Sequence, residues 1–482
     1  MGRGSLTGWR GRARLSAAVA VAGVVRRACR VLGRGATSLP GLVALRIEPR
    51  LVGLLSGGLG QGSLVVAGTN GKTTTSALLA AALEAGGREV LHNRAGSNML
   101  RGIAATLCAR AGLAGTLRGG EGLTGLFEVD EAALPGVLPQ ISPRFVVLTN
   151  LFRDQLDRYG ELQGIADRWR PELASLPSGS RVLLNADDPL IASLGDGLGE
   201  RAVYFGVERW DGPDQQLEAP GSADSLFCPR CGAPLAFSRF SYAHLGHWSC
   251  QQCGNARPTP AISGIVTGEG GRGGLMLVAG AFGEVSLPLA LPGRYNAYNA
   301  LAALAAALAA GVPAHIAVAS IGAATGVFGR AESIQVGDRS VQLYLIKNPT
   351  GADEVLRVVA GEDTGSSLLL LLSDLAADGH DVSWIWDARF DRLAGWSGDL
   401  WCGGTRAEDM ALRCKYAGLG PVREVIPRDP ALALRTALAG TAPGGTLIVL
   451  ATYTAMLAAR HSLTRSGHVD PYWRGGGGLN RR

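Results

Sequence analysis

The segment Gly68–Thr75 has the residue types and spacing of a phosphate-binding loop: Gly-Thr-Asn-Gly-Lys-Thr-Thr-Thr. An apolar run precedes it and a helical pattern follows it, so the N–H groups of a helix start would point at an anion. In such a loop Lys72 would neutralise the outer phosphates of a nucleotide, and the Thr73 hydroxyl would bind Mg²⁺. The full Walker spacing needs a glycine where Val66 stands, so a chance glycine-rich loop is the alternative. The candidate nucleotide-binding residues of the loop are Gly68, Thr69, Asn70, Gly71, Lys72, Thr73 and Thr74.

Lysine is rare in this chain, which draws attention to the few positions that keep it. Of the 46 Lys and Arg residues, only Lys72, Lys347 and Lys415 are lysine. A compact ammonium group contacts phosphate oxygens in a way that a planar guanidinium does not. We therefore expect Lys72 to face a phosphate. Lys347, which is followed by Asn-Pro-Thr-Gly, is a second candidate, with an ordinary surface lysine as the alternative.

Acidic residues stand at the end of another apolar run. Glu128 and Asp130 alternate with apolar residues where a strand is expected to end. Ligands of open α/β sheets bind at the carboxyl ends of strands, and Mg²⁺ bound with a nucleotide usually has a carboxylate ligand there. Glu128 is therefore the candidate Mg²⁺ ligand together with Thr73, and a solvated strand edge is the alternative.

Four of the eight cysteines have the spacing of a zinc ribbon, C-x2-C-x18-C-x2-C. Each pair stands in a tight turn that ends in glycine, and four thiolates suit tetrahedral Zn²⁺. A closed four-cysteine site leaves no open position, so we expect a structural metal; disulfides or free thiols are the alternative. The predicted ligands are Cys228, Cys231, Cys250 and Cys253, and the other cysteines are expected to be reduced core thiols.

Alternating strand and helix patterns must position these residues. They predict an α/β fold with a mostly parallel sheet. We expect a basic N-terminal helical segment over 1–55, a central phosphate-loop domain over 56–332 with the ribbon inserted at 219–260, a Rossmann-like C-terminal α/β domain over 333–470, and a flexible tail over 471–482. The expected strands are 64–67, 126–129, 145–149, 182–185, 203–207, 343–346, 368–372, 400–403 and 447–451, and the main expected helices are 74–85, 299–310, 407–417 and 431–438.

The first 34 residues are strongly basic. They contain eight arginines and no acid, arranged around the apolar stretch 16–25. This stretch is too short to span a bilayer, and arginines follow it at once without a clear signal cleavage site. We expect a basic helix that packs on the protein body or lies on an anionic membrane surface. The expected location is cytoplasmic, with a peripheral position at the inner face of the plasma membrane as the second option.

Several further stretches occur in an order that resembles the Mur ligases of peptidoglycan synthesis and the folylpolyglutamate synthases. Besides the phosphate loop they are Thr149-Asn150, 153–158, 185–189, 296–303 and Gly329-Arg330. The ribbon and the stretch Asp378–Asp387 (Asp-Gly-His-Asp-Val-Ser-Trp-Ile-Trp-Asp) narrow the resemblance to the Mur ligase-like subunits of lipid II isoglutaminyl synthases. The resemblance runs from about residue 15 to 460, nearly the whole chain.

This resemblance implies an ATP-dependent amidation. ATP phosphorylates the α-carboxylate of D-isoglutamate in the lipid II stem peptide, and ammonia attacks the acyl phosphate to give D-isoglutamine. The ammonia comes from glutamine through a GatD-like glutaminase partner in a heterodimer. The implied cofactors are ATP, Mg²⁺ and Zn²⁺. By resemblance, the further site residues are Asn299 (adenine), Arg330 and Lys347 (ATP), Glu128 (Mg²⁺) and Asp381, which completes the partner's Cys–His pair as a triad.

The chain departs from the amino-acid-adding members of this family. Those ligases hold a second Mg²⁺ with a carbamylated lysine, and here no lysine lies between Lys72 and Lys347. They also carry Asp-His where this chain has Asp154-Gln155. Both departures favour ammonia over an amino acid as the acceptor. No spare cysteine stands in the context of a nucleophile elbow, which agrees with a separate glutaminase.

Three alternatives stay open from the sequence. An autonomous amino-acid ligase of the Mur or folylpolyglutamate type is the alternative enzyme. For Asp381, a loop-capping aspartate is the structural alternative, and Asp378 is the acid most easily confused with it. A zinc-ribbon module that binds nucleic acid would suit the net charge of +6. The ribbon at 227–254 is not densely basic, so we expect no nucleic-acid partner.

Overall fold

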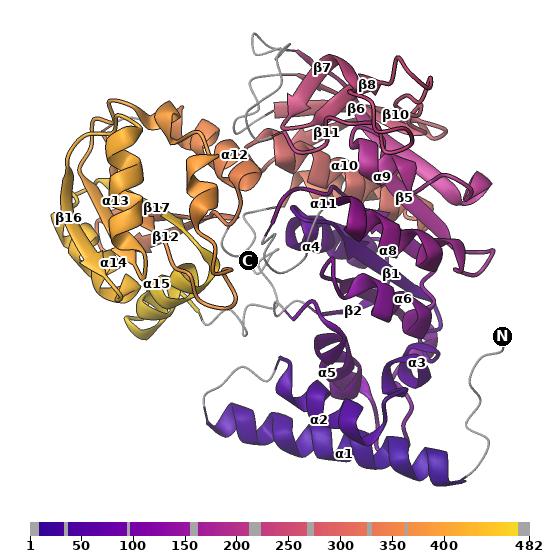
Figure 1. Cartoon of the computed structure of the whole chain (residues 1–482). Helices are drawn as coiled ribbons and strands as arrows, with labels where there is room; N and C mark the ends of the chain where they lie inside the picture. The colour runs from indigo at the N-terminus through magenta and orange to yellow at the C-terminus, as the bar shows by residue number, and fades with distance from the viewer. Residues whose placement is uncertain are drawn as a thin grey trace.

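The computed structural model describes residues 9–32, 37–93, 97–154, 162–211, 223–267, 274–324, 330–361 and 365–470. Figure 1 shows three parts: a layer of helices at the N-terminal end, a large sheet with helices on both faces, and a second sheet beside it. The α/β class with parallel sheets that the sequence predicted is confirmed. The tail expected over 471–482 lies outside the described residues.

The large sheet has nine strands, and its centre is parallel. The strand order is β11-β10-β9-β6-β5-β4-β1-β3-β2, in which only β10 and β11 run antiparallel to their neighbours. The strand β1, which leads into the phosphate loop, lies between β3 and β4. The strands are β1 Ser63–Ala67, β2 Glu89–His92, β3 Leu123–Glu128, β4 Phe145–Leu148, β5 Arg181–Asn185, β6 Ala202–Asp211, β9 Ile262–Thr267, β10 Gly274–Gly280 and β11 Gly283–Leu289.

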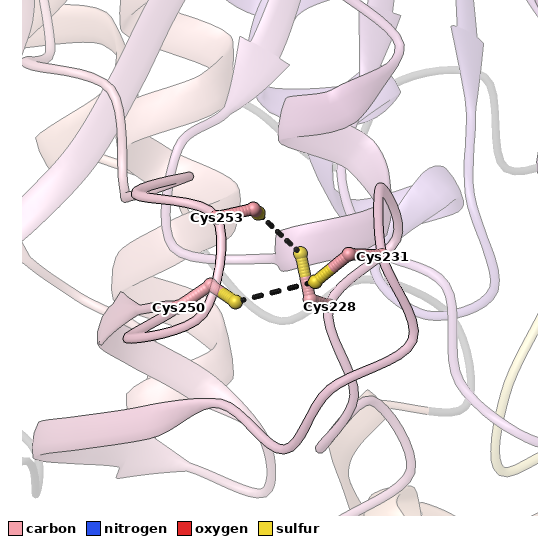
Figure 2. A group of neighbouring side chains, drawn as sticks. All are labelled: Cys228, Cys231, Cys250 and Cys253. Atoms are coloured by element: carbon pink, nitrogen blue, oxygen red, sulfur yellow. Dashed lines mark hydrogen bonds between the residues drawn. The ribbon is translucent and has the colours of Figure 1, made fainter.

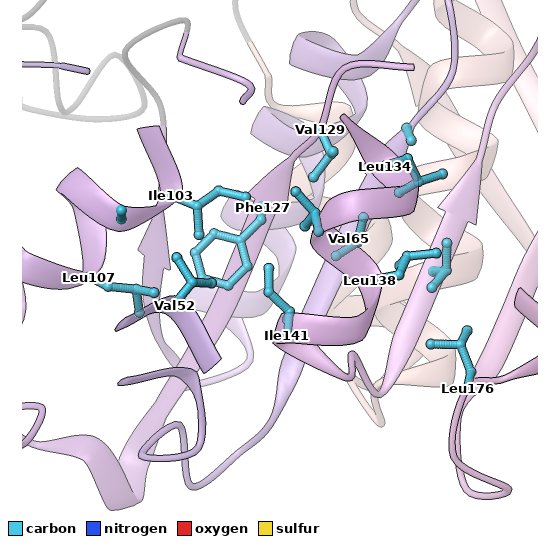
Figure 3. Close-up of a cluster of buried hydrophobic side chains, with 14 of the residues drawn as sticks. Val52, Val65, Ile103, Leu107, Phe127, Val129, Leu134, Leu138, Ile141 and Leu176 are labelled. Atoms are coloured by element: carbon cyan, nitrogen blue, oxygen red, sulfur yellow. The ribbon is translucent and has the colours of Figure 1, made fainter. Parts of the chain in front are cut away.

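Helices cover both faces of this sheet, so its central strands are buried from end to end. That burial explains why β1, β3 and β4 are mostly apolar runs rather than alternating ones. Figure 3 shows Phe127 of β3 and Val65 of β1 packed among leucine and isoleucine side chains of the helices. One face carries α4 Lys72–Ala85, α10 Arg294–Ala309 and α11 Ala314–Gly322, and the other carries α5 Leu100–Arg110, α6 Leu134–Ile141 and α8 Leu162–Ala174.

The basic N-terminal residues form helices that extend the second of these layers. They are α1 Trp9–Val31, α2 Leu39–Ile47 and α3 Leu51–Ser56. The helix α1 buries Leu15, Ala18, Val19 and Ala22 in the same core as α5. Nowhere in the described ranges is a helix both long and apolar enough to cross a membrane.

The second sheet has six strands in the order β12-β13-β17-β14-β15-β16, and only β12 is antiparallel to its neighbour. Two separate apolar clusters fill its two faces. The strands are β12 Arg330–Val336, β13 Arg339–Leu345, β14 Ser367–Leu371, β15 Leu400–Gly404, β16 Val422–Pro427 and β17 Thr446–Ala451; the helices are α12 Pro349–Ala360, α13 Ala407–Tyr416, α14 Pro430–Gly440 and α15 Tyr453–Arg465.

The cysteine-rich stretch folds as an insert between β6 and β9. Its hairpin, β7 Ala236–Tyr242 and β8 Leu245–Ser249, forms a two-stranded sheet of its own. A cysteine turn lies on each side of the hairpin in the chain, so the hairpin brings the two turns together. The short helix α9, Pro189–Ser193, follows β5.

Candidate active site

The loop after β1 needs glycine at two positions. Gly68 and Gly71 have φ angles of 135° and 86°, a region that side chains with a Cβ rarely adopt. A Cβ on Gly68 would lie 2.2 Å from Thr149 Oγ1, and one on Gly71 would lie 2.0 Å from Asn299 Oδ1. The N-cap residue of α4 is Gly71, which has no side chain to cap the first N–H groups of that helix. The first N–H groups of that helix therefore remain suited to hold an anion.

Lys72 lies inside this loop and is 5% exposed. Its Nζ donates to the carbonyls of Gly68 (2.5 Å) and Thr69 (3.1 Å) and to Glu131 Oε2 (2.8 Å). Burial lowers the pKa of Lys72, but the carboxylates of Glu131 and Asp130 outweigh burial and raise it above the ordinary lysine value. Burial raises the pKa of Glu131, but the ammonium groups of Lys72 and Lys347 outweigh it and hold that pKa low. Lys72 therefore stays charged, as a phosphate ligand must.

The two residues predicted to bind Mg²⁺ are in contact. Thr73 Oγ1 donates to Glu128 Oε1 at 3.0 Å, and Glu128 is 6% exposed at the end of β3. The Asn93 side chain fixes the backbone of Glu128 through two hydrogen bonds of 2.9 Å. A hydroxyl and a carboxylate side by side are the oxygen ligands that Mg²⁺ takes, so these residues fit the ion. Asp130, by contrast, uses its side chain to cap the turn at Ala132.

Residues from the start of the second sheet's first helix reach across to the phosphate loop. Lys347 donates to Asp154 and, at 3.4 Å, to the Thr69 carbonyl. The side chains of Asn348 and Asn70 exchange hydrogen bonds of 3.1 and 3.4 Å. Burial raises the pKa of Asp154 more than the Lys347 ammonium lowers it. Its Oδ1 is buried and has no hydrogen-bond partner among the described residues.

The other two predicted ATP residues are placed differently. Asn299 is 2% exposed on α10, where its Oδ1 accepts from Thr75 Oγ1 at 3.3 Å and its Nδ2 donates to Asn296. It therefore braces the loop from behind, and its contact with adenine stays a prediction. Arg330 begins β12, but its side chain lies outside the described residues.

Within the described residues, two cavities between the two sheet units share Lys347 in their lining. A small one of about 50 Å³ is lined by Gly71, Lys347 and three tyrosines, Tyr242, Tyr295 and Tyr344. A larger one of about 150 Å³ is lined by Asp154, Lys347 and Asn348 and also by Asp378, Asp381, Ser383 and Trp384.

Asp378 and Asp381 differ sharply within this larger cavity. Asp378 is 6% exposed, and its carboxylate accepts from both the N–H (2.8 Å) and the hydroxyl of Thr454. Asp381 is exposed, and within the described residues its carboxylate accepts from Ser383, through the backbone N–H at 2.8 Å and through the side chain, which is the arrangement of a loop-capping aspartate. The Ser383 hydrogen bonds also hold the pKa of Asp381 below its usual value. Asp378 is thus held inside the fold, whereas Asp381 is bonded within its own loop and exposed to solvent, and the triad role of Asp381 stays a prediction.

The four predicted zinc ligands converge (Figure 2). The Sγ atoms of Cys228 and Cys253 are 3.6 Å apart, those of Cys231 and Cys250 are 3.5 Å apart, and all four lie within 4.8 Å of one another. These distances exclude disulfide bonds and suit four sulfur ligands around one Zn²⁺. Burial raises the pKa of Cys228, but the N–H groups of Arg230 and Cys231 outweigh it and lower that pKa to about 6.

The ribbon is tied to the loop that carries Asp154. His244, fully buried, lies 3.3 Å from Asp188 Oδ2 and accepts from the Asp224 N–H. Asp188 also accepts from the Leu151 N–H (2.8 Å), and Asp224 from the backbone N–H (2.9 Å) and side chain of Arg153. The ribbon thus braces residues 151–153, directly before Asp154.

We expect Cys228→Ser/Cys250→Ser to lose the metal and to weaken this brace. Zinc content, measured by mass spectrometry of the purified protein, should fall from about one ion per chain to almost none. The thermal unfolding temperature should also fall, because binding free energy of a structural metal is folding free energy. Cys29→Ser, outside the ribbon, is the matched control and should keep the zinc. Full zinc content in the double variant would contradict the assignment.

We expect the buried pair of Lys72 and Glu131 to be strongly coupled in stability. Glu131→Gln leaves the buried Lys72 ammonium without its ion-pair partner and should cost about 3–5 kcal/mol in unfolding free energy. Lys72→Met added to Glu131→Gln should recover much of that loss, because no buried charge remains. Urea unfolding of Glu131→Gln, of Lys72→Met and of the double variant measures the coupling free energy of the pair. If the unfolding free energies lost in the two single variants add up in the double variant, the two residues are not coupled, which would contradict this prediction.

Comparison with known proteins agrees with this geometry. The family model of the Mur ligase middle domain matches residues 66–217. The fold resembles that of a pseudomurein peptide ligase type C from Methanothermus fervidus, with a TM-score of 0.63 and 20% identity, over 85% of this chain and 79% of that one. The fold and site define an ATP-dependent ligase of the Mur ligase class.

More specific relatives narrow the class. The family model of the MurT ligase C-terminal region matches residues 345–456. Subunit MurT of lipid II isoglutaminyl synthase (glutamine-hydrolyzing) from Streptococcus pneumoniae (strain ATCC BAA-255 / R6) is 34% identical over 90% of this chain and 93% of its own length. The MurT subunit from Staphylococcus aureus (strain COL) is 30% identical over 93% and 98%. This chain therefore belongs to the MurT family, as the sequence resemblance predicted.

Proposed function

We propose that this chain is the ligase subunit that amidates the α-carboxylate of D-isoglutamate in lipid II, with ammonia from a GatD-like glutaminase. The observation that carries the proposal is the larger cavity between the sheets. It joins Lys347 and Asp154, beside the phosphate loop, to the exposed Asp381. An ammonia source docked at Asp381 would thus face a cavity that leads to the site where the carboxylate is activated.

In the first step a carboxylate oxygen attacks the γ-phosphorus of ATP, and the bond to the leaving ADP oxygen breaks. The N–H groups at the start of α4 and the Lys72 ammonium bind the phosphates, which concentrates positive charge where negative charge develops. Mg²⁺ on Thr73 and Glu128 would neutralise further phosphate charge. The small cavity lined by three tyrosines is suited to the flat adenine ring, and an adenine bound there would contact the tyrosines rather than Asn299, which does not line this cavity.

In the second step ammonia attacks the acyl carbon, phosphate leaves, and the nitrogen gives up one proton. Asp154, which lines the larger cavity, is suited to accept that proton, because its Oδ1 is buried without a hydrogen-bond partner among the described residues and burial raises the pKa of its carboxyl. Its bond to Lys347 also holds the two sheet units together at the site.

The glutaminase chemistry is assigned to a partner because no cysteine of this chain suits it. The four cysteines outside the ribbon, Cys29, Cys108, Cys402 and Cys414, are all buried. Burial raises the pKa of Cys108 to about 12, and the neighbouring Cys414 and burial raise that of Cys402. Buried thiols of this kind are poor nucleophiles. Asp381 would instead orient the histidine of the partner's Cys–His pair, a role that needs one positioned carboxylate.

Lipid II as the substrate places the chain in the cytoplasm, at the inner face of the plasma membrane. The names of the MurT relatives support the substrate and the use of glutamine. An autonomous amino-acid ligase is the alternative. Two findings count against it: this chain has no central lysine for a second Mg²⁺, and Asp381 is exposed at the mouth of the cavity.

The purified chain with lipid II, ATP and Mg²⁺ should form a carboxamide when ammonium chloride is supplied at alkaline pH, where free ammonia is abundant. Mass spectrometry of the stem peptide measures the exchange of hydroxyl for amine. Glutamate and lysine, offered under the same conditions, should not be joined. Ligation of either amino acid, without formation of the primary carboxamide from ammonia, would overturn the proposal in favour of the alternative.

A further inference from the structure

We propose that the outward face of α1 binds the surface of an anionic lipid bilayer. The helix lies along the outer edge of the molecule, at the end of the central sheet away from the second sheet (Figure 1). Its inner face is fixed in the core through Leu15, Ala18, Val19 and Ala22. The opposite face is therefore presented by a rigid helix that is already folded.

An apolar stripe runs along this outward face. Val21, Val24 and Val31 are 37%, 65% and 87% exposed, although valine is usually buried. Ala13, Ala17 and Ala28 are also exposed, and the spacing of three and four residues places these positions on one side of the helix. Two further exposed leucines extend the apolar surface near the two ends of α1. They are Leu32, directly after the helix, and Leu113, in the loop whose Gly115 touches Leu15.

Arginines border the stripe: at helical spacing Arg12, Arg26, Arg27 and Arg30 follow one side of it, and Arg14, which donates to the Ile47 carbonyl and lies 3.9 Å from Glu48, stands on the other. Arg12, Arg14, Arg27 and Arg30 are exposed, and Arg26 is half-buried. No ion pair joins Arg12, Arg26, Arg27 or Arg30 to a carboxylate within the ranges that the structure describes. Burial and the like charges of Arg30, Arg118 and Arg27 lower the pKa of Arg26, so these guanidinium groups repel one another. Such a cluster is relieved by an anionic surface.

The apolar stripe together with the arginines favours an anionic bilayer over nucleic acid as the ligand of this face. A helix with arginines around an apolar stripe lies in the plane of the headgroups, with its apolar side towards the acyl chains. Nucleic acid would contact the arginines but leave the valines in water. Because the stripe is made only of valine and alanine, we expect attraction to anionic headgroups to dominate, and binding to weaken with salt.

This inference deepens the proposed function, since a polyprenyl-linked substrate lies in a membrane, but it is tested without that substrate. The full chain, alone and with its glutaminase partner, is floated with vesicles of phosphatidylcholine or of phosphatidylcholine with phosphatidylglycerol, both free of lipid II. We expect about tenfold more binding to the anionic vesicles, and its loss in high salt. Failure here leaves the amidation assay unaffected, so the two claims fail separately.

Two variants test the surface itself. Arg26→Gln/Arg27→Gln/Arg30→Gln should lower binding about tenfold, and Val24→Ser/Val31→Ser should lower it several-fold. The matched controls are substitutions at exposed positions of the second sheet and its helices. They are Arg423→Gln/Arg435→Gln/Arg465→Gln and Val425→Ser/Leu432→Ser, and they should bind as the parent does. Unfolding temperatures identify any variant that is misfolded. Equal binding to both vesicles, unchanged binding of the α1 variants, or binding to RNA in place of vesicles would overturn the inference.

Discussion

Replacing Lys72 by arginine should reduce the kcat of ATP-dependent amidation by about 10²–10³-fold, whichever nitrogen source is supplied. Lys72 is 5% exposed and already makes three hydrogen bonds within a loop whose glycines leave no spare space. A guanidinium keeps the positive charge but is planar and larger, so it cannot reach the same point. Rates with ammonium chloride, measured at saturating ATP, give the effect directly.

Lys415→Arg is the matched control, because Lys415 is exposed on α13, far from the loop in sequence. It should leave the rate unchanged. The unfolding temperature of Lys72→Arg separates loss of chemistry from loss of fold. A folded Lys72→Arg variant with the parent's rate would show that this lysine does not act on the phosphates.

Changing Asp381 to asparagine should affect amidation with glutamine and amidation with free ammonium very differently. Glutamine-supported amidation with the partner present should fall by about 10³–10⁴-fold, the scale seen when a triad loses the acid that orients its histidine. Amidation driven by free ammonium should persist, because Asp381 is exposed and forms no described contact with a residue of the phosphate loop. The ratio of the two rates is the quantity to measure.

Asp378→Asn provides the contrast, three residues away. Asp378 binds Thr454 through both carboxylate oxygens and is nearly buried, so its loss should lower stability and affect both nitrogen sources alike. Equal losses under both sources in Asp381→Asn would contradict the triad role. A selective loss in Asp378→Asn alone would move that role to Asp378.

The pair of Lys72 and Glu131 also sets a pH range for stability. The pKa of Glu131 is lowered in the folded chain, so its contribution is present above the pKa of an unfolded glutamate and is lost as pH falls through the folded value. The pKa of Lys72 is raised, so its contribution is present below the pKa of an unfolded lysine and is lost as pH rises through the folded value. The pair stabilises the fold over the neutral range between these limits.

Local sequence predicted the features that depend on local geometry. The apolar run before Gly68 became β1, and the helix expected from Thr74 begins at Lys72. The spacing of the four ribbon cysteines sufficed to predict their convergence, because two tight turns and a hairpin bring them together. Thr73 and Glu128 are in contact because β1 and β3 are adjacent and parallel: Thr73 lies just beyond the loop that follows β1, and Glu128 is the last residue of β3. Their binding of Mg²⁺ stays a prediction.

The sequence did not predict the contacts that depend on how elements distant in the chain pack together. Glu131, the partner of Lys72, stands among three acids within four residues, and only the turn after β3 decides which of them faces the loop. The contacts of Lys347 with Asp154 and of Asn348 with Asn70 depend on the placement of the second sheet beside the first. The antiparallel edge strands β10 and β11 were also not predicted, although their signal is local: an apolar run over 274–279 is followed by a short turn between Gly280 and Gly283.

The central claim is tested most directly by joining this chain to a GatD-like glutaminase and supplying lipid II, ATP, Mg²⁺ and glutamine labelled with ¹⁵N in its side-chain amide. The account predicts that the label appears in a new carboxamide on the second residue of the stem peptide, only when both subunits and ATP are present. Lipid II that stays unamidated under these conditions, or a carboxamide formed without ATP, would contradict it.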